Sequence, residues 1–570
     1  MNRRNMMASL SGLAALAAVN ASAAPRAESL SSAAGPGSSL SVFNPRQFGA
    51  VGDGKTLDTA AINAAIDACT HAGGGTVYLP PGTYLCGSVV LKSHVTLYLE
   101  AGATVLGSAN VADFATRLDD ASAMTEKKLP RHLIYAKGAD HIGICGPGRI
   151  DGQGQSYWSL KNQPPVVNNE NRWRNAVQWL WDARDRPSPM VVLVGCTNVR
   201  LEDVRVENAP AWTIMFNNCA KVVVHSIAIK NPVYGPNCDG IDIVSSQDVM
   251  ISDCIIDTGD DAICLKSGSD WLPGGLPSLT KNIVVTNCII SGCCNGFKIG
   301  TGSFGGFENI TFSNSVIYND EVDLPSRIIS GIALEIVDGG WIDGVVISGI
   351  QMRRVRAPIF IRRGNRSSKE DHAQRRLRGV LIQGIHATDS IMTSAIIGIP
   401  SMPIEDVSLS GIHIDTIFPG HKDWVNNPIP ESEKLYPEVW MSGWLPASGL
   451  YCRHVKGLQL KDLHFRAPAN EWRSTVICDS VSQLTLTGLT TTAVVGGIPP
   501  LGLNSVSSAW ISAVAAPAGS QALLSVQGAQ SADILVSGCD ARHATTLAQI
   551  DHDVQPAVLH AEFNITSSKI

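Results

Sequence analysis

The sequence of 570 residues has few charged residues, few aromatic residues and no strong excess of either charge. Lys and Arg total 44 and Asp and Glu total 50, so the net charge is −6. This balance lacks the basic footprint of a nucleic-acid-binding protein, and no nucleic-acid partner is expected. Charged residues make up 16% of the chain and aromatic residues 6%, whereas Gly reaches 53. Low charge with much glycine favours a chain rich in buried β-structure.

No hydrophobic run is long enough to cross a membrane as a helix, so no membrane partner is expected. The chain begins with a basic stretch, a short Ala-rich apolar stretch and the small residues 21–23. This pattern predicts a signal peptide at residues 1–23 and export to the periplasm or beyond the cell. Arg3 and Arg4 are compatible with the twin-arginine route and with an ordinary secretory signal. Residues 24–41 are predicted to be a flexible linker.

The chain has 14 cysteines, but it has neither paired CxxC motifs nor the Cys/His spacing of a metal site. The pattern therefore predicts no metal and no cofactor. Cys254, Cys264 and Cys288 lie inside apolar runs, which favours small buried core residues. One or two disulfides remain open, because an exported protein can form them.

The sequence does contain a repeat. From Met190 onward, short segments of alternating apolar residues recur about every 22 to 35 residues, with turns rich in Asn, Ser, Asp and Gly. Alternation with a period of two indicates short strands. One such unit cannot bury its apolar face alone, so successive units must stack, which predicts an all-β solenoid, a parallel β-helix. The irregular repeat length and the missing blade signature disfavour a β-propeller.

This solenoid is predicted to be a single domain at residues 42–570, with catalytic coils at about 190–366 and degenerate closing coils at about 491–570. An open solenoid needs a cap. The segment 58–71 predicts an amphipathic capping helix, with Asp58 as its N-cap and glycines 73–75 as its stop.

Aspartates gather in residues 237–268, NCDGIDIVSSQDVMISDCIIDTGDDAICLKSG. When three successive coils are aligned on their first strands, the residues just before the strands are Asp239, Asp261 and Asn295. Coils stack about 4.8 Å apart. Asp239 and Asp261 are therefore expected one above the other, with Asp260 beside them.

Alternation along the strands places more polar side chains on the same outer face. Asp242, Cys264 and Lys298 occupy equivalent outward positions, and Lys266 and Glu335 also point outward. The periodicity thus predicts a cluster of carboxylates flanked by lysines.

Carboxylates this close raise one another's pKa, which gives a folded protein no structural advantage. It is useful where one carboxyl must stay protonated while others act as bases, as in glycoside hydrolysis with inversion, where the two carboxyls are generally about 6.5–9.5 Å apart. The competing interpretations are a calcium site and aspartates that merely end turns.

Several stretches resemble one family. Residues 237–243, NCDGIDI, are similar to the Asn-x-Asp-Gly motif of family 28 of the glycoside hydrolases, the polygalacturonase-like family of the pectin-active β-helix superfamily. Residues 258–268, TGDDAICLKSG, are similar to its Asp-Asp motif. The segments 48–108, 146–158 (GPGRIDGQGQSYW) and 186–190 (RPSPM) also match.

The resemblance covers about residues 43–490. It implies a right-handed parallel β-helix and an inverting hydrolase, acting without a cofactor on pectic poly- or oligosaccharide, and a monomer is expected. By motif position Asp260 would be the general acid, and Asp239 with Asp261 would activate the water. Asn237, in the first motif, is expected to contact the substrate.

Two positions depart from the family pattern. Its Gly-His-Gly falls at residues 294–296, so Asn295 replaces the histidine, and its Arg-x-Lys falls at Ala333 to Glu335, so both cations are gone. A guanidinium fork pairs with a carboxylate in a way that Ala and Glu cannot. Either Lys298 substitutes as the cation, or the sugar at this point is neutral, such as rhamnose.

Besides Asn237, the candidate substrate-binding residues are Asn295, Lys298, Lys266, Glu335 and Arg362. Lys266 flanks the carboxylates, and Arg362 is expected on the outer face near the cleft. An insertion at 418–448 is rich in aromatic residues, which could wall a cleft by stacking on sugar rings.

Two alternative functions stay open. A polysaccharide lyase on the same scaffold would use Ca²⁺ with a Lys or Arg base, and Lys266 and Lys298 are present. The second alternative is a solenoid that binds carbohydrate without cleaving it. The altered positions at Asn295 and at 333–335 favour this alternative, whereas the retained Asp239, Asp260 and Asp261 disfavour it.

Overall fold

The computed structural model describes residues 41–116, 131–160, 181–268, 278–292, 294–319, 328–367 and 376–566. The residues Ser41–Ile570 form one compact unit. The predicted signal peptide and nearly all of the predicted linker lie outside the described residues. Among the described helices, none combines the length and the apolar character that crossing a membrane requires.

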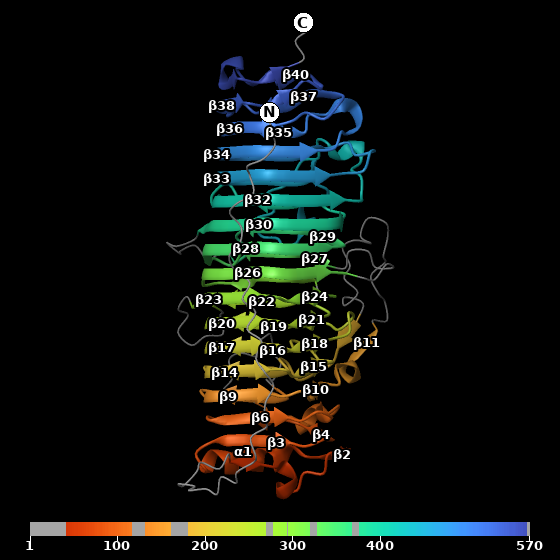
Figure 1. Ribbon diagram of the computed structural model, residues 1–570, viewed down its shortest axis with the longest axis vertical. Coiled ribbons are helices and arrows are strands. Elements are labelled where there is room, and N and C mark those ends of the chain that lie inside the picture. Colours follow the sequence, from red (N-terminus) through yellow and green to blue (C-terminus); the bar gives the residue numbers. More distant parts are fainter. Residues whose placement is uncertain are drawn as a thin grey trace, which may run out of the picture. The chain divides into compact units, whose positions relative to one another are not determined.

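The unit is a stack of coils whose strands pair side by side in parallel (Figure 1). Within the described residues, 38 strands join into one sheet that winds along the stack. Most strands pair with the equivalent strand one coil earlier and one coil later; for example, β16 pairs with both β13 and β19. The fold is therefore the predicted all-β, right-handed parallel β-helix.

The strands before the candidate site are β1 (Val42–Phe43), β2 (Asp53–Leu57), β3 (Gly75–Leu79), β4 (Gly82–Cys86), β5 (Val89–Val90), β6 (Val95–Leu99), β7 (Ala103–Gly107), β8 (Ile134–Lys137), β9 (Asp140–Cys145), β10 (Arg149–Asp151) and the antiparallel side pair β11 (Trp158–Leu160) and β12 (Trp181–Ala183). The central strands are β13 (Val191–Val194), β14 (Thr197–Glu202), β15 (Arg205–Glu207), β16 (Ile214–Asn217), β17 (Ala220–His225), β18 (Ala228–Lys230), β19 (Ile241–Val244), β20 (Gln247–Ser252), β21 (Ile255–Asp257), β22 (Ile263–Ser267), β23 (Leu279–Thr286), β24 (Ile289–Ser291), β25 (Asn295–Ser303), β26 (Gly306–Tyr318), β27 (Ile328–Ile336), β28 (Trp341–Arg353) and β29 (Val355–Arg363). The closing strands are β30 (Leu377–Ser390), β31 (Ser394–Ile397), β32 (Ile404–Thr416), β33 (Ala447–Arg466), β34 (Ser474–Thr491), β35 (Leu501–Asn504), β36 (Ser507–Val514), β37 (Ser520–Gln527), β38 (Ala532–Ser537), β39 (Asp540–Ala541), β40 (Ala544–Ile550), β41 (Leu559–Glu562) and β42 (Ile565–Thr566). Short 3-10 helices lie between them: η1 (Pro45–Phe48), η2 (Val111–Asp113), η4 (Gly154–Tyr157), η6 (Lys422–Trp424), η7 (Val439–Ser442), η8 (Val495–Gly497) and η9 (Pro556–Val558).

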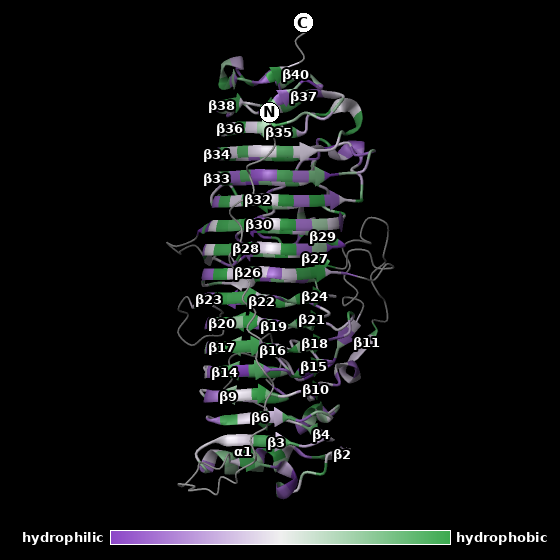
Figure 2. Cartoon of the chain, in the orientation of Figure 1, coloured by the Kyte–Doolittle hydropathy of each residue, from purple (hydrophilic) through white to green (hydrophobic). Residues whose placement is uncertain are grey.

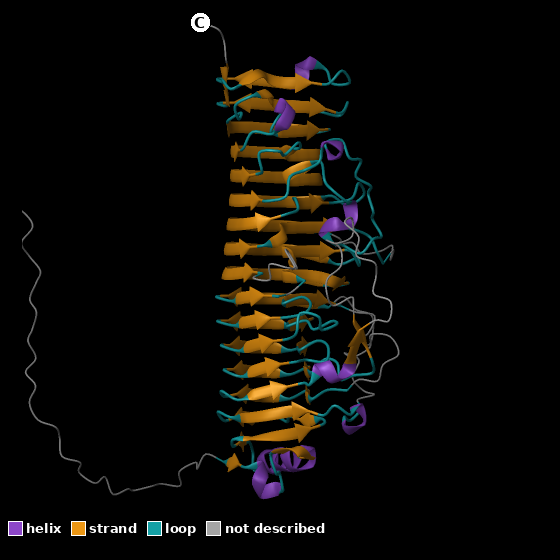
Figure 3. Cartoon of the chain, turned by 90° about the vertical axis from the view of Figure 1, so that its right-hand side faces the viewer, coloured by secondary structure: helices purple, strands orange, loops and turns teal. Residues whose placement is uncertain are grey.

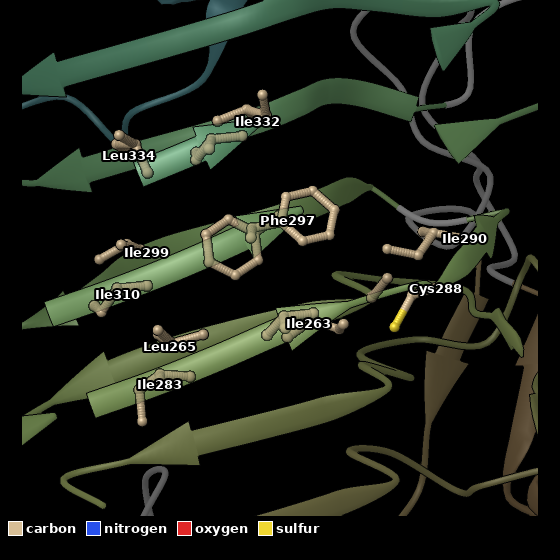
Figure 4. Packing of buried hydrophobic residues seen from close by; sticks show 14 of the residues in the cluster. Ile263, Leu265, Ile283, Cys288, Ile290, Phe297, Ile299, Ile310, Ile332 and Leu334 are labelled. Atoms are coloured by element: carbon tan, nitrogen blue, oxygen red, sulfur yellow. The ribbon is translucent and has the colours of Figure 1, made fainter. Parts of the chain in front are cut away.

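The interior of the stack is built by alternate residues of each strand. Figure 4 shows matching inward pairs on successive coils, which are Ile263 and Leu265 on β22, Phe297 and Ile299 on β25, and Ile332 and Leu334 on β27. The rings of Phe297 and Phe312 stack with centroids 4.7 Å apart. Residues between the inward ones face outward, and the polar and apolar bands along the strands in Figure 2 follow this alternation.

One turn, which lies inside β20, β23 and β26 rather than between strands, repeats from coil to coil because Asp or Asn recurs there. Asp248, Asn282 and Asn309 each have a positive φ, a conformation that Asn and Asp tolerate better than most residues. Their side chains form a ladder, since Asn282 Nδ2 donates to Asp248 Oδ1 at 2.7 Å and Asn309 Nδ2 donates to Asn282 Oδ1 at 3.1 Å. Each turn is thus stabilised by the turn of the next coil.

The helix α1 (Thr59–His71) covers the first coil, as predicted, and packs against β3 and β5 (Figure 1). Its apolar stripe is fully buried and consists of Ile62, Ala65, Ile66 and Cys69. The prediction for Asp58 was wrong in its mechanism. Its side chain makes no capping hydrogen bond and instead accepts from Val51 N at 2.7 Å and Gly52 N at 2.9 Å. Asp58 therefore fastens the preceding loop to the helix start.

Among the described cysteines none forms a disulfide, and all are buried except the half-buried Cys145. Cys293 lies outside the described residues. Cys254 and Cys288 belong to the apolar core, as predicted, whereas Cys264 is buried on the outer face, with its Sγ 2.8 Å from Lys266 Nζ.

Long connections and short helices gather along one side of the stack (Figure 3). One of them, the insertion between β32 and β33, carries η6 and η7. Its aromatic residues pack on one another, with Trp424 and Trp444 stacked at 4.4 Å and Phe418 against Trp444 at 5.2 Å. This mutual packing gives the insertion a small apolar core of its own.

Candidate active site

The candidate site is built from residues at the starts of β19, β22 and β25. The backbone ladder continues through them, because Gly240 N donates to Asp261 O at 2.8 Å and Ala262 N donates to Asn295 O at 2.9 Å. The register pairs Asp242 with Cys264. Asp239, Asp261 and Asn295 therefore occupy the same position on three successive coils, as the alignment predicts.

The structure brings the three aspartates into one cluster. One carboxylate oxygen from each of Asp239, Asp260 and Asp261 lies within 4.8 Å of the other two. Asp239 and Asp261 are buried, with 4% and 6% of their surface exposed, and Asp260 is half-buried. These oxygens are closer than the carboxyl separation of about 6.5–9.5 Å that is general for inverting glycosidases, so the spacing alone does not assign the stereochemistry.

Burial and like charge act together on these acids. Burial raises the pKa of Asp260 to about 7, and the neighbouring Asp261 adds to the rise, while Lys298 and Lys266 oppose it. Burial, Asp242 and Asp260 hold the pKa of Asp239 well above its usual range. Asp239 and Asp260 therefore both have a raised pKa. Near neutral pH this pair retains a proton that isolated aspartates would have lost.

Lys266 lies at one edge of the cluster. Its ammonium lies 2.8 Å from Asp242 Oδ1, 3.9 Å from Asp239 Oδ2 and 4.7 Å from the centre of the Trp212 ring. Burial alone would lower the pKa of Lys266, but Asp242 and its other anionic neighbours outweigh burial and raise it well above its usual range. Lys266 is therefore a permanent cation committed to the protein's own carboxylates.

Lys298 lies at the other edge and is 2% exposed. Its ammonium is 3.2 Å from Asp261 Oδ2 and 3.4 Å from Glu335 Oε2. The amide of Asn295 also donates to Asp261 Oδ1, at 2.7 Å. Burial works against the charge of Lys298, yet Asp261 and Glu335 raise its pKa well above its usual range. The charge of Lys298 is shared between two protein carboxylates.

Asn237 lies at the exposed rim of the site, with a positive φ of 56°. Its Oδ1 accepts a hydrogen bond of 3.5 Å from Arg186 Nη2. Arg186 is buried, and its Nη1 also donates to the carbonyls of Pro210 and Pro236. Arg186 thus anchors the turn that carries Asn237, a role for the RPSPM segment that the sequence analysis missed.

The expectation for Arg362 needs correction. Its side chain leaves the outer face of β29 as predicted, but it is only 1% exposed because the 418–448 insertion covers it. Its guanidinium donates to the carbonyls of Gly398 at 3.2 Å, Glu431 at 2.7 Å and Ser432 at 3.2 Å. Arg362 holds the insertion on the stack and is not presented to a substrate.

The insertion adds two residues whose roles the sequence analysis did not identify. The ring of Tyr436 lies 5.6 Å from Lys298 Nζ. Burial raises the pKa of Glu438 well above its usual range, and Glu335, Asp261 and Asp260 raise it further, which places its carboxyl in the electrostatic field of the cluster. Tyr436 was noted only as one aromatic residue of the insertion. Nothing in the sequence marks Glu438, because it comes from a connection far along the chain.

The same oxygens could hold a divalent cation, since among the described residues the aspartate trio is a group with ligand atoms close enough to share one. The ammonium groups of Lys266 and Lys298 already neutralise part of the negative charge of the aspartate trio. The chemistry of the cluster is therefore that of acids and bases with two fixed counter-charges.

A family profile described as "Glycosyl hydrolases family 28" matches residues 69–429. A "Probable polygalacturonase" of Vitis vinifera is 28% identical over 393 residues, which cover 64% of this chain and 73% of that protein. An "Exo-poly-alpha-D-galacturonosidase" of Dickeya chrysanthemi is 30% identical over 344 residues, which cover 55% of each chain. The chain therefore spans between about half and three quarters of the length of these relatives.

A solved structure with the same fold is that of a hyperthermoactive exopolygalacturonase from Thermotoga maritima. It superposes with a TM-score of 0.53 at 23% identity and covers 66% of this chain and 87% of the other. At this identity the likeness supports the β-helix architecture.

Proposed function

The chain belongs to family 28 of the glycosyl hydrolases, and from that premise we propose that it is an exported, inverting glycosidase that cleaves a galacturonosyl or rhamnosyl linkage in pectic polysaccharide or its oligosaccharides. Membership makes the chain a glycoside hydrolase. The pectic substrate is proposed because the relatives described above are named for polygalacturonan cleavage. The observation that carries the proposal is the clustering of Asp239, Asp260 and Asp261 with a retained proton.

In the proposed mechanism Asp260 gives its proton to the oxygen of the leaving sugar as the glycosidic bond breaks. Water supplies the new oxygen on the anomeric carbon, and Asp261 or Asp239 takes the proton that the water loses. The motif position favours Asp260 as the acid. Its pKa near 7 supports this, because Asp260 keeps its proton up to neutral pH. Asp261 is suited to be the base, because Lys298 and Asn295 bind its negative charge.

Inversion is proposed from family membership, and a retaining reaction through a glycosyl-enzyme intermediate is the competing outcome. Proton NMR of a digest, recorded before the products mutarotate, distinguishes the two. A first-formed product of inverted anomeric configuration supports the proposal. A product that keeps the substrate's configuration would rule out the single-displacement mechanism.

The central experiment is product analysis with purified protein on homogalacturonan, rhamnogalacturonan and their oligosaccharides. We expect new reducing ends from at least one of them and almost none with Asp260→Asn. Product sizes also separate endo from exo cleavage. If no substrate is cut, or if Asp260→Asn is fully active on the best one, the proposed function is wrong.

A lyase is the second candidate on this scaffold, but Lys266 and Lys298 are poor bases for it. Their carboxylate neighbours raise both pKa values well above the usual range, so both stay protonated. A lyase would give unsaturated products that absorb ultraviolet light, and the absorbance would disappear with EDTA. A saturated product formed equally well in EDTA supports the hydrolase.

Export is proposed from the leader-like pattern at residues 1–23. Expression of the full chain in a bacterial host, followed by N-terminal sequencing of the exported protein, tests it. A mature chain that begins near residue 24 supports export. Uncleaved protein confined to the cytoplasm would contradict it. The protein is proposed to act as a monomer, which light scattering checks.

A further inference from the structure

Buried hydrogen-bond acceptors gather near Lys298. Asn295 Oδ1, Glu335 Oε1 and Glu438 Oε2 are shielded from solvent and accept no hydrogen bond from the protein. Glu335 Oε2 has the ammonium of Lys298 as its partner, at 3.4 Å. Native proteins rarely leave buried polar atoms unpaired, because each costs free energy. Several such atoms around one residue indicate a place where a ligand supplies the donors.

Three of the cations near this place already have carboxylate partners, and a fourth, the buried Arg356, lies against the ring of Trp440. Lys298 is shared by Asp261 and Glu335, and Lys266 pairs with Asp242. Arg366 forms a two-pronged pair with Asp338, at 2.8 and 2.9 Å. A sugar carboxylate would have to displace one of these partners. It would also place a carboxylate beside the carboxyl groups of Glu335 and Glu438, whose pKa values burial raises.

The 418–448 insertion closes this place from above the coils. Tyr436 lies between Lys298 and Arg366, with its ring centre 5.6 Å from Lys298 Nζ and 5.4 Å from Arg366 Cζ. Half of its surface is exposed, so the ring offers an open apolar face. Aromatic faces of this kind suit the C–H face of a sugar ring. Glu438, two residues on, is close enough to Lys298 and Glu335 for their charges to affect its carboxyl.

The position of Lys298 indicates which sugar ring of the substrate would lie against Lys298, Glu335 and Glu438. Lys298 contacts Asp261, the proposed base for the water that attacks the anomeric carbon. The ring against Lys298, Glu335 and Glu438 is therefore the ring whose anomeric carbon reacts.

We propose that the reacting sugar is neutral, and that Asn295, Glu335 and Glu438 select it by accepting hydrogen bonds from its hydroxyl groups while they reject a uronate carboxylate. Glu335 and Glu438 are thus specificity residues of this subsite. The inference rests on the proposed function and adds the class of the reacting sugar, a neutral hexose or deoxyhexose. A site built to bind hydroxyl groups discriminates strongly, because a ligand without matching donors leaves its buried acceptors unpaired.

The test is to identify the sugar at each new reducing end after digestion of rhamnogalacturonan and homogalacturonan oligosaccharides. We expect a neutral sugar there, and kcat/KM for its linkage about 100-fold or more above that for a galacturonosyl linkage. Galacturonic acid at the new reducing end overturns the inference and leaves the proposed function intact. An absence of new reducing ends from every substrate overturns both.

Variants separate a specificity role from a structural one. Glu438→Gln and Glu335→Gln keep the side-chain size and are expected to lower kcat/KM for the neutral sugar about 10-fold or more, because each replaces an acceptor by a donor. Their kcat/KM for a galacturonosyl linkage should stay level or rise. Asp423→Asn makes the same chemical change at an exposed position of the same insertion and is expected to alter neither value. Equal losses on both linkages, or none, would contradict the proposal.

Glu335→Lys restores a cation next to Lys298 and supplies an independent check. It is expected to move the preference toward the galacturonosyl linkage by at least about 10-fold. Circular dichroism first establishes that the variant keeps the β-helix. A folded variant with an unchanged preference would count against the charge argument.

Discussion

The ammonium of Lys298 lies 3.2 Å from the carboxylate of Asp261, which the preceding coil supplies. This ion pair separates the roles of two acids that are neighbours in the chain. Asp261 has a fixed counter-charge, whereas Asp260 has a pKa raised to about 7 by burial and by Asp261. Stacking of coils thus lets one Asp-Asp pair carry both a charged and a protonated carboxyl.

The first prediction concerns the proton donor. Asp260→Asn removes the proton that the leaving oxygen needs, so kcat should fall about 10²- to 10⁴-fold, with a smaller change in KM. Steady-state kinetics on the best oligosaccharide measures it. Asp253→Asn, an exposed turn aspartate of the same coil, serves as the control and should retain activity. Comparable losses in both variants would mean that the effect is structural.

The second prediction concerns the pH dependence of activity. Because the pKa of Asp260 is raised to about 7, kcat/KM should fall as the pH rises through about 7. The acidic limb should reflect protonation of the base. A pH–rate profile from pH 4 to about 9 measures both limbs. An activity that still increases above pH 8 would exclude Asp260 as the acid.

The third prediction is a change of stability with pH. At low pH Asp260 is protonated in both the folded and the unfolded protein. Between about pH 4 and pH 7 only the folded protein keeps this proton. The wild type therefore loses stability as the pH rises through this window. Asp260→Asn lacks this loss. Its free energy of unfolding relative to wild type should therefore increase from pH 5 to pH 8 by about 2 kcal/mol, a value reduced for the partial exposure of Asp260. Denaturant unfolding at the two pH values measures the change, and a constant difference would contradict it.

The fourth prediction concerns the interior of the stack under the site. Phe297→Ala removes a fully buried ring from the strand that carries Asn295 and Lys298, and should cost about 3–5 kcal/mol. The matched control is Phe563→Ala, because Phe563 is 88% exposed. Thermal unfolding followed by circular dichroism should give a clear drop in Tm for the first variant and almost none for the second. Similar Tm values would mean that the coil repacks around the cavity.

The fifth prediction concerns the attachment of the insertion. Arg362→Met deletes the donors to the carbonyls of Gly398, Glu431 and Ser432, which should cost about 1–3 kcal/mol and free the insertion from the stack. Limited proteolysis should cut within residues 418–448 sooner than in wild type. Lys456→Met, at an exposed position of β33, should leave the digestion pattern unchanged. Identical patterns for both variants would exclude the anchoring role.

The stacking of the aspartates was predictable because it depends on local alternation and on a repeat, both of which are visible in the sequence. Ile263 and Phe297 share a register position because each begins an apolar alternation after a turn. From that register the outward positions of Asp242 and Lys298 follow, and the structure has them there.

The insertion was not predictable in the same way. Arg362 has the periodicity of an outward residue, but its exposure depends on a connection that begins more than fifty residues later in the chain. Glu438 reaches the cluster through the packing of Trp424 and Trp444, for which no repeat exists. The partners of Asp58 were also not predictable from the helix pattern. Its carboxylate accepts hydrogen bonds from Val51 N and Gly52 N in the preceding loop and does not cap the helix.

The position of the insertion in the chain has a consequence for biosynthesis. Asp239 to Glu335 belong to consecutive coils and can assemble as soon as that part of the chain has left the ribosome or the export channel. Glu438 and Tyr436 arrive later, and their loop is completed by β33, which pairs with β31 and β32. The clustered aspartates therefore precede the wall beside them in the order of synthesis, and the insertion is completed only after their coils have been made.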